Sequence, residues 1–264
     1  MTSNPPAVIK LGGETLAEQH ATLEGVAEAA RRQPLVIVHG GGKRLSGWLD
    51  RLGVQSRFED GRRVTDDETL SVAIAVLRGL VNAELVASLQ RLGAAAVGIS
   101  GVDGGLVVAE RVPGLGRVGR VVGAQPQVVE DLLRGGFVPV VAPIALDDVG
   151  EICNVNADEV AAGLAAALGG RLILLSDTDG VRDGAGRKIG RLDGPAVEQL
   201  IEEGIISGGM IPKVRGALAV LSAGGRDVVI ADGRGPGAIA RALDDPAYGT
   251  HLVAPARPAS DRAG

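Results

Sequence analysis

The sequence predicts an α/β protein whose central sheet is covered by helices on both faces. Only 2% of its 264 residues are aromatic, so the core must be built mainly from Val, Leu, Ile and Ala packed closely between helices and strands. Several short apolar runs, such as residues 35–38, show no alternation with polar residues, which is typical of strands buried on both faces of a parallel sheet. Amphipathic segments follow these runs, as helices follow strands in such folds.

Composition and charge limit the possible functions. The chain is 45% hydrophobic and 22% charged, which allows a large core in one sizeable domain or two lobes. A net charge of -5 argues against a nucleic-acid surface, so any phosphate site is local. The single cysteine, Cys153, is expected in the core, and the three scattered histidines cannot assemble a zinc cluster.

The start of the sequence has no signal-peptide pattern, and we find no apolar run of membrane-spanning length. We therefore expect a soluble, cytoplasmic protein that has neither a membrane nor a nucleic acid as a partner.

The first predicted elements bring a lysine next to a glycine turn. Residues 7–11 form a short strand that carries Lys10 and runs into Gly12 and Gly13, and residues 16–32 form a helix. A lysine near the end of a buried strand either extends to solvent along its aliphatic stem or faces an anion held by the glycine turn. The residues alone leave both interpretations open.

The next strand and loop are the centre of the predicted site. Residues 35–38 lead into three glycines at 40–42 and then into a helix over 45–53. Glycine N–H groups at a helix N-terminus favour an anion, because no Cβ blocks the approach and the helix dipole is positive there. A tight strand-to-helix turn without a ligand is the alternative.

Named glycine motifs do not fit this sequence. A Walker A loop requires Gly-x4-Gly-Lys-Ser/Thr, whereas Arg44 stands where the hydroxyl residue should be. An esterase oxyanion loop requires a Gly-x-Ser-x-Gly elbow, and residues 98–102 lack its last glycine. The formal Gly-x-Gly-x-x-Gly at 114–119 precedes a second apolar stretch instead of a helix, so we interpret it as part of a hairpin.

Residues 55–64 predict another hairpin, with an Asp-Gly turn at 60–61. Arg62 and Arg63 follow the turn, and the default expectation for each is a surface pair with a nearby carboxylate such as Glu59 or Asp66.

A long helix follows the hairpin. Thr65 and Glu68 have the spacing of a capping box, which places the helix start at Thr65. Apolar residues continue at helical spacing to Leu92, and Gly93 ends the helix.

The rest of the chain continues to alternate strands and helices. The predicted strands lie at 95–99, 106–111, 117–122, 137–142, 151–154, 171–176, 227–231 and 250–253, and the predicted helices at 127–133, 156–168, 195–203, 212–224 and 237–243.

Polar residues mark three of these boundaries. Asn156 can cap its helix together with Glu159. Capping does not explain Asn154 and Asp158, which are either ordinary polar residues or site residues. The polar loop at 177–181 follows a buried strand, where α/β sheets bind ligands.

Pro212 suits the first position of a helix. This places Lys213 in the first turn, where the helix dipole opposes a cation by about 0.3–1 kcal/mol. A bound polyanion would reverse that sign.

Six motifs, in order over residues 7–253, resemble those of the amino acid kinase family. They are Ile9-Lys10-Leu11-Gly12-Gly13, Val38-His39-Gly40-Gly41-Gly42, Asp60-Gly61-Arg62-Arg63-Val64-Thr65, Asn154-Val155-Asn156-Ala157-Asp158, Leu174-Leu175-Ser176-Asp177 and Ser207-Gly208-Gly209-Met210-Ile211-Pro212-Lys213. Within the family they are most similar to the members that phosphorylate N-acetyl-L-glutamate.

The resemblance implies a three-layer αβα sandwich with a mainly parallel sheet. It further implies an N-terminal lobe, residues 1–170, for the amino acid and the dimer contact, and a C-terminal lobe, residues 171–264, for ATP. The implied reaction transfers the γ-phosphoryl group of ATP to the side-chain carboxylate of N-acetyl-L-glutamate, in arginine and ornithine biosynthesis. Mg²⁺ would travel with ATP, and no separate protein metal site is expected.

The family's roles carry over to matching positions. Lys10 and Lys213 would neutralise the transferring phosphoryl group, and Asp158 would hold both lysines. Gly12 and Gly13 would contact the phosphoryl group. The substrate would be bound by Gly41, Gly42, Arg63 and Asn154, and the nucleotide by Asp177, Thr178, Asp179, Gly180, Val181, Arg182, Ile205, Ile206 and Ser207.

Two alternatives share this fold. One is a kinase for α-aminoadipate attached to an acidic carrier protein, which should show departures around the hairpin and residues 154–158. The other is a non-catalytic amino acid sensor, against which the joint presence of Lys10, Asp158 and Lys213 argues.

The resemblance also leads us to expect a homodimer, formed through the helix after Thr65 with Ala73, Val76 and Leu80 on its free face.

We further expect no inhibition by arginine. The first strand starts near Ala7, which leaves six residues, too few for the extra N-terminal helix of inhibited family members. Gly237 and Ala242 stand where those members carry a histidine and a glutamate.

Overall fold

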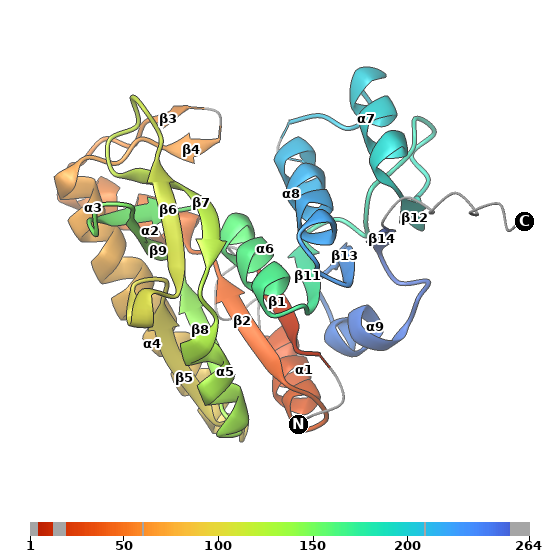
Figure 1. Cartoon of the computed structure of the whole chain (residues 1–264), viewed down its shortest axis with the longest axis horizontal. Coiled ribbons are helices and arrows are strands. Elements are labelled where there is room, and N and C mark those ends of the chain that lie inside the picture. The colour runs from red at the N-terminus through yellow and green to blue at the C-terminus, as the bar shows by residue number, and fades with distance from the viewer. Residues whose placement is uncertain (1–4, 13–19, 60, 209, 254–264) are drawn as a thin grey trace, which may run out of the picture.

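The computed structural model describes residues 5–12, 20–59, 61–208 and 210–253. Its main sheet has eight strands in the order β12-β14-β13-β11-β1-β2-β8-β5 (Figure 1). All neighbours are parallel except β13 and β14, which confirms the predicted mainly parallel sheet. The strands are β1 (Ala7–Leu11), β2 (Leu35–His39), β5 (Ala96–Ser100), β8 (Val138–Ala142), β11 (Arg171–Ser176), β12 (Arg191–Leu192), β13 (Asp227–Asp232) and β14 (Thr250–Leu252).

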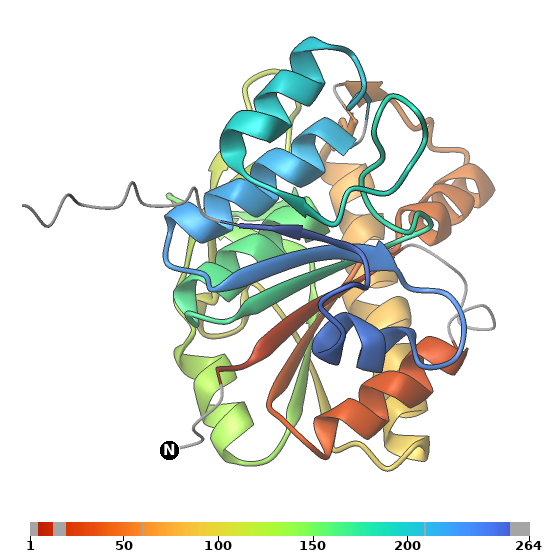
Figure 2. The same ribbon diagram turned by 90° about the vertical axis from the view of Figure 1, so that its right-hand side faces the viewer.

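Helices cover both faces of the sheet, and two hydrophobic cores result. In β11, Leu172 and Leu174 belong to one core and Ile173 and Leu175 to the other, as the alternation of side chains along a strand requires. Figure 2 shows α7 and α8 over one face and α1 and α9 over the other. The first core contains residues of α5 (Gln127–Arg134), α6 (Ala157–Ala167), α7 (Gly194–Glu202) and α8 (Met210–Ser222), and the second contains residues of α1 (His20–Ala30), α4 (Asn82–Arg91) and α9 (Ala238–Asp244).

A small closed barrel stands beside the main sheet. It consists of β6 (Val107–Arg111), β7 (Val118–Ala124), β9 (Ile144–Asp147) and β10 (Ile152–Val155). The antiparallel pair β6 and β7 confirms the hairpin predicted around residues 114–119. Cys153 is fully buried, as expected, and burial raises the pKa of its thiol to about 11. A one-turn 3₁₀ helix, η2 (Asp103–Gly105), precedes the barrel.

The predicted long helix is continuous but starts one residue later than expected. It consists of α3 (Asp67–Ala73), a π-helical stretch η1 (Ile74–Val81) and α4. Asp66, not Thr65, is the N-cap, because its side chain accepts a hydrogen bond from the Thr69 N–H at 2.8 Å. The Thr65 hydroxyl instead donates to the Arg63 carbonyl at 2.7 Å.

This helix also corrects two expectations. Its 25 residues make it the one helix within the described ranges that could cross a membrane by length and composition, with a mean hydropathy of 1.7 and 28% of the scored window buried. The expectation from the sequence that no apolar segment is long enough to span a membrane is therefore wrong. Ala73 and Val76 were expected on a free face, but both pack in a core with Leu45 and Leu49 of α2 (Gly42–Leu52).

Some predicted features fall outside the described residues: part of the first helix, Gly13, the turn residue Asp60 and Gly209 of the last motif. The described part of the hairpin consists of β3 (Phe58–Glu59) and β4 (Arg62–Arg63). Helix α8 begins, among described residues, at Met210, so Pro212 is its third residue and not its first. Lys213 remains in the first turn.

Candidate active site

The carboxyl ends of β1, β2 and β11 lie at one edge of the sheet, which is where open α/β sheets bind ligands. Two cavities of about 280 and 240 Å³ open there, and Lys10 lines both. The first cavity is lined mainly by the ends of β1 and β11 and the starts of α2 and α8. The second is lined by the glycine loop after β2, the hairpin and residues 154–158.

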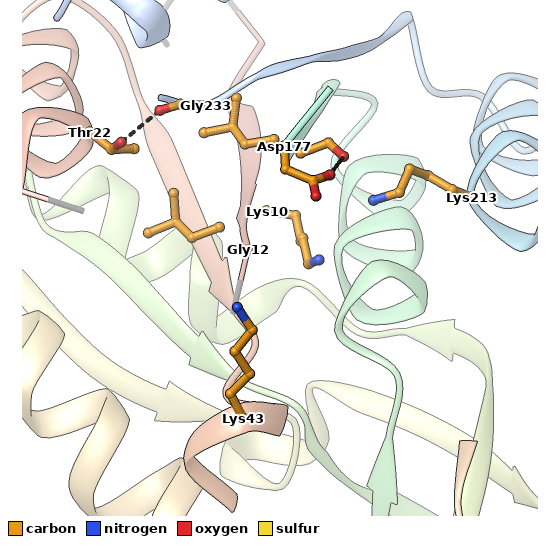
Figure 3. Close-up of a pocket in the computed structure, with 10 residues that line it drawn as sticks. Lys10, Gly12, Thr22, Lys43, Asp177, Lys213 and Gly233 are labelled. Atoms are coloured by element: carbon orange, nitrogen blue, oxygen red, sulfur yellow. Dashed lines mark hydrogen bonds between the residues drawn. The ribbon is translucent and has the colours of Figure 1, made fainter. Parts of the chain in front are cut away.

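A shared carboxylate joins Lys10 and Lys213 beside the two cavities. The Lys10 Nζ lies 3.0 Å from one oxygen of Asp158, and the Lys213 Nζ lies 3.8 Å from the other. These residues come from β1, the first turn of α6 and the first turn of α8. Burial lowers the pKa of Lys213, and the charge of Asp158 opposes that shift. Figure 3 shows Lys10, Lys213 and Asp177 pointing into the first cavity.

The cap of α6 helps to place Asp158. The Asn156 side chain accepts a hydrogen bond from the Asp158 N–H at 2.7 Å, as predicted for a capping residue. The predicted capping role of Glu159 is wrong, because its carboxylate accepts from Arg62 at 2.6 Å and from the Val121 N–H at 2.9 Å. Glu159 thus ties the hairpin and the barrel to α6.

The second cavity contains a buried arginine. Only 7% of Arg63 is exposed. Its guanidinium donates to Ser46 at 2.7 Å, to the Gly42 carbonyl at 3.3 Å and to Ser56, and it lies over the Phe58 ring. The default expectation of a surface pair with a carboxylate is therefore wrong. Burial lowers the pKa of Arg63, and no carboxylate hydrogen-bonds to the guanidinium within the described ranges, so it can accept an anionic ligand.

Asn154 lies in the same cavity and is connected to Arg63. The Asn154 amide donates to the Thr65 hydroxyl at 3.2 Å, and that hydroxyl donates to the Arg63 carbonyl. Arg63 and Asn154, which are 91 positions apart in the chain and belong to separate motifs, thus both line the second cavity. Capping does not explain Asn154, since it precedes the cap residue and lies in β10.

The glycine loop is held by a buried histidine. Because a carbonyl only accepts hydrogen bonds, the 2.7 Å contact between His39 Nδ1 and the Gly40 oxygen places the proton on Nδ1. His39 Nε2 then accepts from the Asn82 amide at 3.0 Å. Burial lowers the pKa of His39 to about 4, which keeps this arrangement neutral.

The same contact orients the loop's N–H groups. In a planar trans peptide the carbonyl and the following N–H point in opposite directions, so anchoring the Gly40 oxygen also directs the Gly41 N–H. Gly41 has φ +155°, and a Cβ there would lie 2.6 Å from the Leu77 side chain. Only glycine fits this position.

The predicted nucleotide residues are only partly brought together. Asp177 lines the first cavity, whereas the side chains of Val181 and Ile206 are buried in the core. The remaining residues of 178–182 and 205–207 do not line either cavity, and their roles stay predictions. Gly12 lines the first cavity, and Gly13 lies outside the described residues.

Sequence reasoning missed three residues that line the first cavity: Thr22, Lys43 and Gly233. The Thr22 hydroxyl donates to the Gly233 carbonyl at 2.7 Å, a contact between residues far apart in the chain that no local pattern indicates. Lys43 could have been identified from the sequence, because it directly follows the three glycines of the predicted anion-binding loop. Within the described ranges, no three His, Cys, Asp or Glu side chains are placed to hold a metal ion.

The arrangement can hold two anions close together. Lysines and glycines line the two cavities, and a buried arginine also lines the second one. Such a site suits transfer of a phosphoryl group between negatively charged molecules, for which positioning and charge neutralisation supply most of the catalysis.

Comparisons with known proteins agree with this chemistry. The model of the amino acid kinase family matches residues 5–232. An acetylglutamate kinase of Solibacter usitatus is 45% identical over 253 residues, covering 93% of this chain and 98% of that protein. One of Rubrobacter xylanophilus is 46% identical over 246 residues, covering 92% and 95%. The crystal structure of smu.665 from Streptococcus mutans has a TM-score of 0.78 at 26% identity and covers 94% of this chain and 98% of its own.

Proposed function

Because the chain belongs to the amino acid kinase family, we propose that it transfers the γ-phosphoryl group of ATP to the side-chain carboxylate of N-acetyl-L-glutamate. The observation that carries this proposal is the meeting of two cavities at Lys10, with Lys213 joined to it through Asp158. The relatives named acetylglutamate kinase, which match over about nine-tenths of the chain, support the choice of acceptor.

In this mechanism the acceptor lies in the second cavity and the phosphates of ATP in the first. A carboxylate oxygen attacks the γ-phosphorus, the new P–O bond gives an acyl phosphate, and the bond to the bridging oxygen breaks to leave ADP. A carboxylate is already ionised and needs no general base. Lys10 and Lys213 neutralise the oxygens of the transferring group, and Asp158 keeps the two lysines together instead of letting them repel.

Arg63 and the glycine loop position the acceptor. The planar guanidinium of Arg63 offers paired donors to the α-carboxylate, and Asn154 contacts the same molecule from the adjacent strand. The N–H groups of Gly41 and Gly42 face the reacting carboxylate. Mg²⁺ enters as part of the MgATP substrate and neutralises the β- and γ-phosphates.

Residues 1–170 act as the lobe for the acceptor and residues 171–264 as the lobe for ATP. The second cavity, lined entirely by residues before 159, supports the first assignment. The protein works as a cytoplasmic homodimer whose contact is the long helix Asp67–Arg91. That helix is apolar around much of its circumference yet mostly not buried, and Leu80 is 37% exposed on it.

A coupled assay of ADP release tests the acceptor. We expect ATP consumption only with N-acetyl-L-glutamate, and trapping with hydroxylamine should reveal the acyl phosphate. Free glutamate should be poor, because its ammonium group would enter the space of the neutral acetamide. Equal turnover with glutamate or α-aminoadipate, or none with any acceptor, would reject the assignment.

A further inference from the structure

Lys43 is a third cation of the first cavity, and none of the motif-based roles includes it. It is the second residue of α2, directly after the glycine loop, and it lines the first cavity together with Lys10 and Lys213. Figure 3 shows its side chain extending from the start of α2 towards the cavity that Lys10, Gly12 and Asp177 also border.

The structure records no salt bridge for Lys43 within the described ranges, whereas the next residue, Arg44, pairs with Glu84 at 2.8 Å. The first turn of α2 contains no acidic residue. A cation at this position is opposed by the positive end of the helix dipole, and an anion bound in the cavity would reverse the sign of that interaction. Lys43 is therefore placed at a helix start that disfavours a cation, beside a cavity that also contains Lys10 and Lys213.

The charges around the first cavity give the reason for a third lysine. Lys10 and Lys213 face two carboxylates, Asp158 and Asp177, so these four groups carry no net charge. A neutral set of residues is a poor receptor for a triphosphate. Lys43 makes the described charged groups at this site net positive.

The location of Lys43 indicates which of the two substrates it contacts. Gly42 lines the second cavity but Lys43 lines only the first, so the chain passes from one cavity to the other between adjacent residues. We propose that Lys43 binds the β- and γ-phosphates of the nucleotide donor, and not the amino acid acceptor. This inference rests on the proposed function, since it assigns the first cavity to the donor.

Binding of a phosphate series to Lys43→Gln measures this role without requiring turnover. The affinities for ATP and ADP should fall by about 10- to 100-fold, the usual effect of losing one charge-assisted contact, while the affinity for AMP stays within about twofold. Lys43→Arg should restore most of the loss. Lys188→Gln is the matched control, because it also removes one surface charge but its Nζ donates to the Ala247 carbonyl, outside both cavities.

Steady-state kinetics then separate donor from acceptor. In Lys43→Gln we expect a higher KM for ATP and an unchanged KM for acetylglutamate. The inference is overturned if ATP and AMP lose affinity equally, if ATP binds as in the wild type, or if only the acceptor KM rises. A wild-type protein that binds ATP but does not phosphorylate acetylglutamate would reject the proposed function and leave the binding comparison for Lys43 valid.

Discussion

A single carboxylate lies between two lysines at the centre of the site, and each member can be tested separately. We expect Lys213→Ala to lower kcat by about 100-fold or more, because it removes one preorganised positive charge from the transferring group. Asp158→Asn should lower kcat more than it lowers the melting temperature, since it releases both lysines without creating a cavity. Wild-type turnover of either variant at saturating substrates would show that its residue has no catalytic role.

His39 makes stability depend on pH. Its pKa is lowered from 6.5 to about 4 by burial, so at intermediate pH the unfolded chain binds a proton that the native protein does not. Above about pH 6.5, His39 is neutral in both states and does not reduce the stability of the native protein. As the pH falls from 6.5 towards 4, the free energy of unfolding decreases, by roughly 3 kcal/mol in total.

Denaturant unfolding at several pH values checks this prediction. His39→Gln should remove most of that slope between about pH 6.5 and 4.5, although the variant starts from lower stability. His20→Gln is the matched control, because the His20 side chain is 71% exposed. Equal slopes for wild type and His39→Gln would contradict the buried neutral state.

For single residues, the sequence predicted correctly those site residues that belong to motifs with strong local patterns. Lys10, Asp158 and Lys213 were identified from motifs and do meet in space. Asn82 was not identified, because its partner His39 lies 43 positions away and nothing near it in the chain marks the contact. Arg63 was given the wrong partners, since its contacts with the Gly42 carbonyl and Ser46 of α2 are tertiary.

Among the elements, the cap of the long helix allows a direct stability test. Asp66→Ala should reduce the free energy of unfolding by about 1 kcal/mol, because the Thr69 N–H loses its acceptor. Asp66→Asn keeps a side-chain oxygen in place and should retain most of the stability. If both variants unfold at the same denaturant concentration as the wild type, the cap does not stabilise this helix.

The same helix shows which features of an element its sequence can predict. Its existence and length follow from helical spacing of apolar residues, but the π-helical turns at Ile74–Val81 have no signature in that spacing. Strands β9 and β12, of four and two residues, were missed because such short segments show no clear period. Buried strands such as β2 and β11 were placed within a residue or two, because continuous apolar runs identify them.

For the whole molecule, the exposed Leu80 on the long, apolar helix predicts a homodimer. Light scattering at two protein concentrations should give a mass near two chains. Leu80→Glu should give a monomer, because it places a charge on the proposed contact. Val149→Glu is the matched control, since Val149 is 75% exposed in the turn before β10, and it should leave the dimer intact.

A wild-type mass near one chain, or a dimer that Leu80→Glu does not alter, would reject this interface.

β1, the strand that carries Lys10, connects the two proposed lobes within the main sheet. β1 pairs with β2 on one side and with β11 on the other, in continuous parallel register. The two proposed lobes are therefore joined through the middle of the sheet by main-chain hydrogen bonds and not by a loose linker. Lys10 is carried by this central strand, next to both proposed lobes. Lys43 and Lys213 lie on helices of opposite lobes, so the cationic lining of the first cavity depends on both lobes being held at this strand.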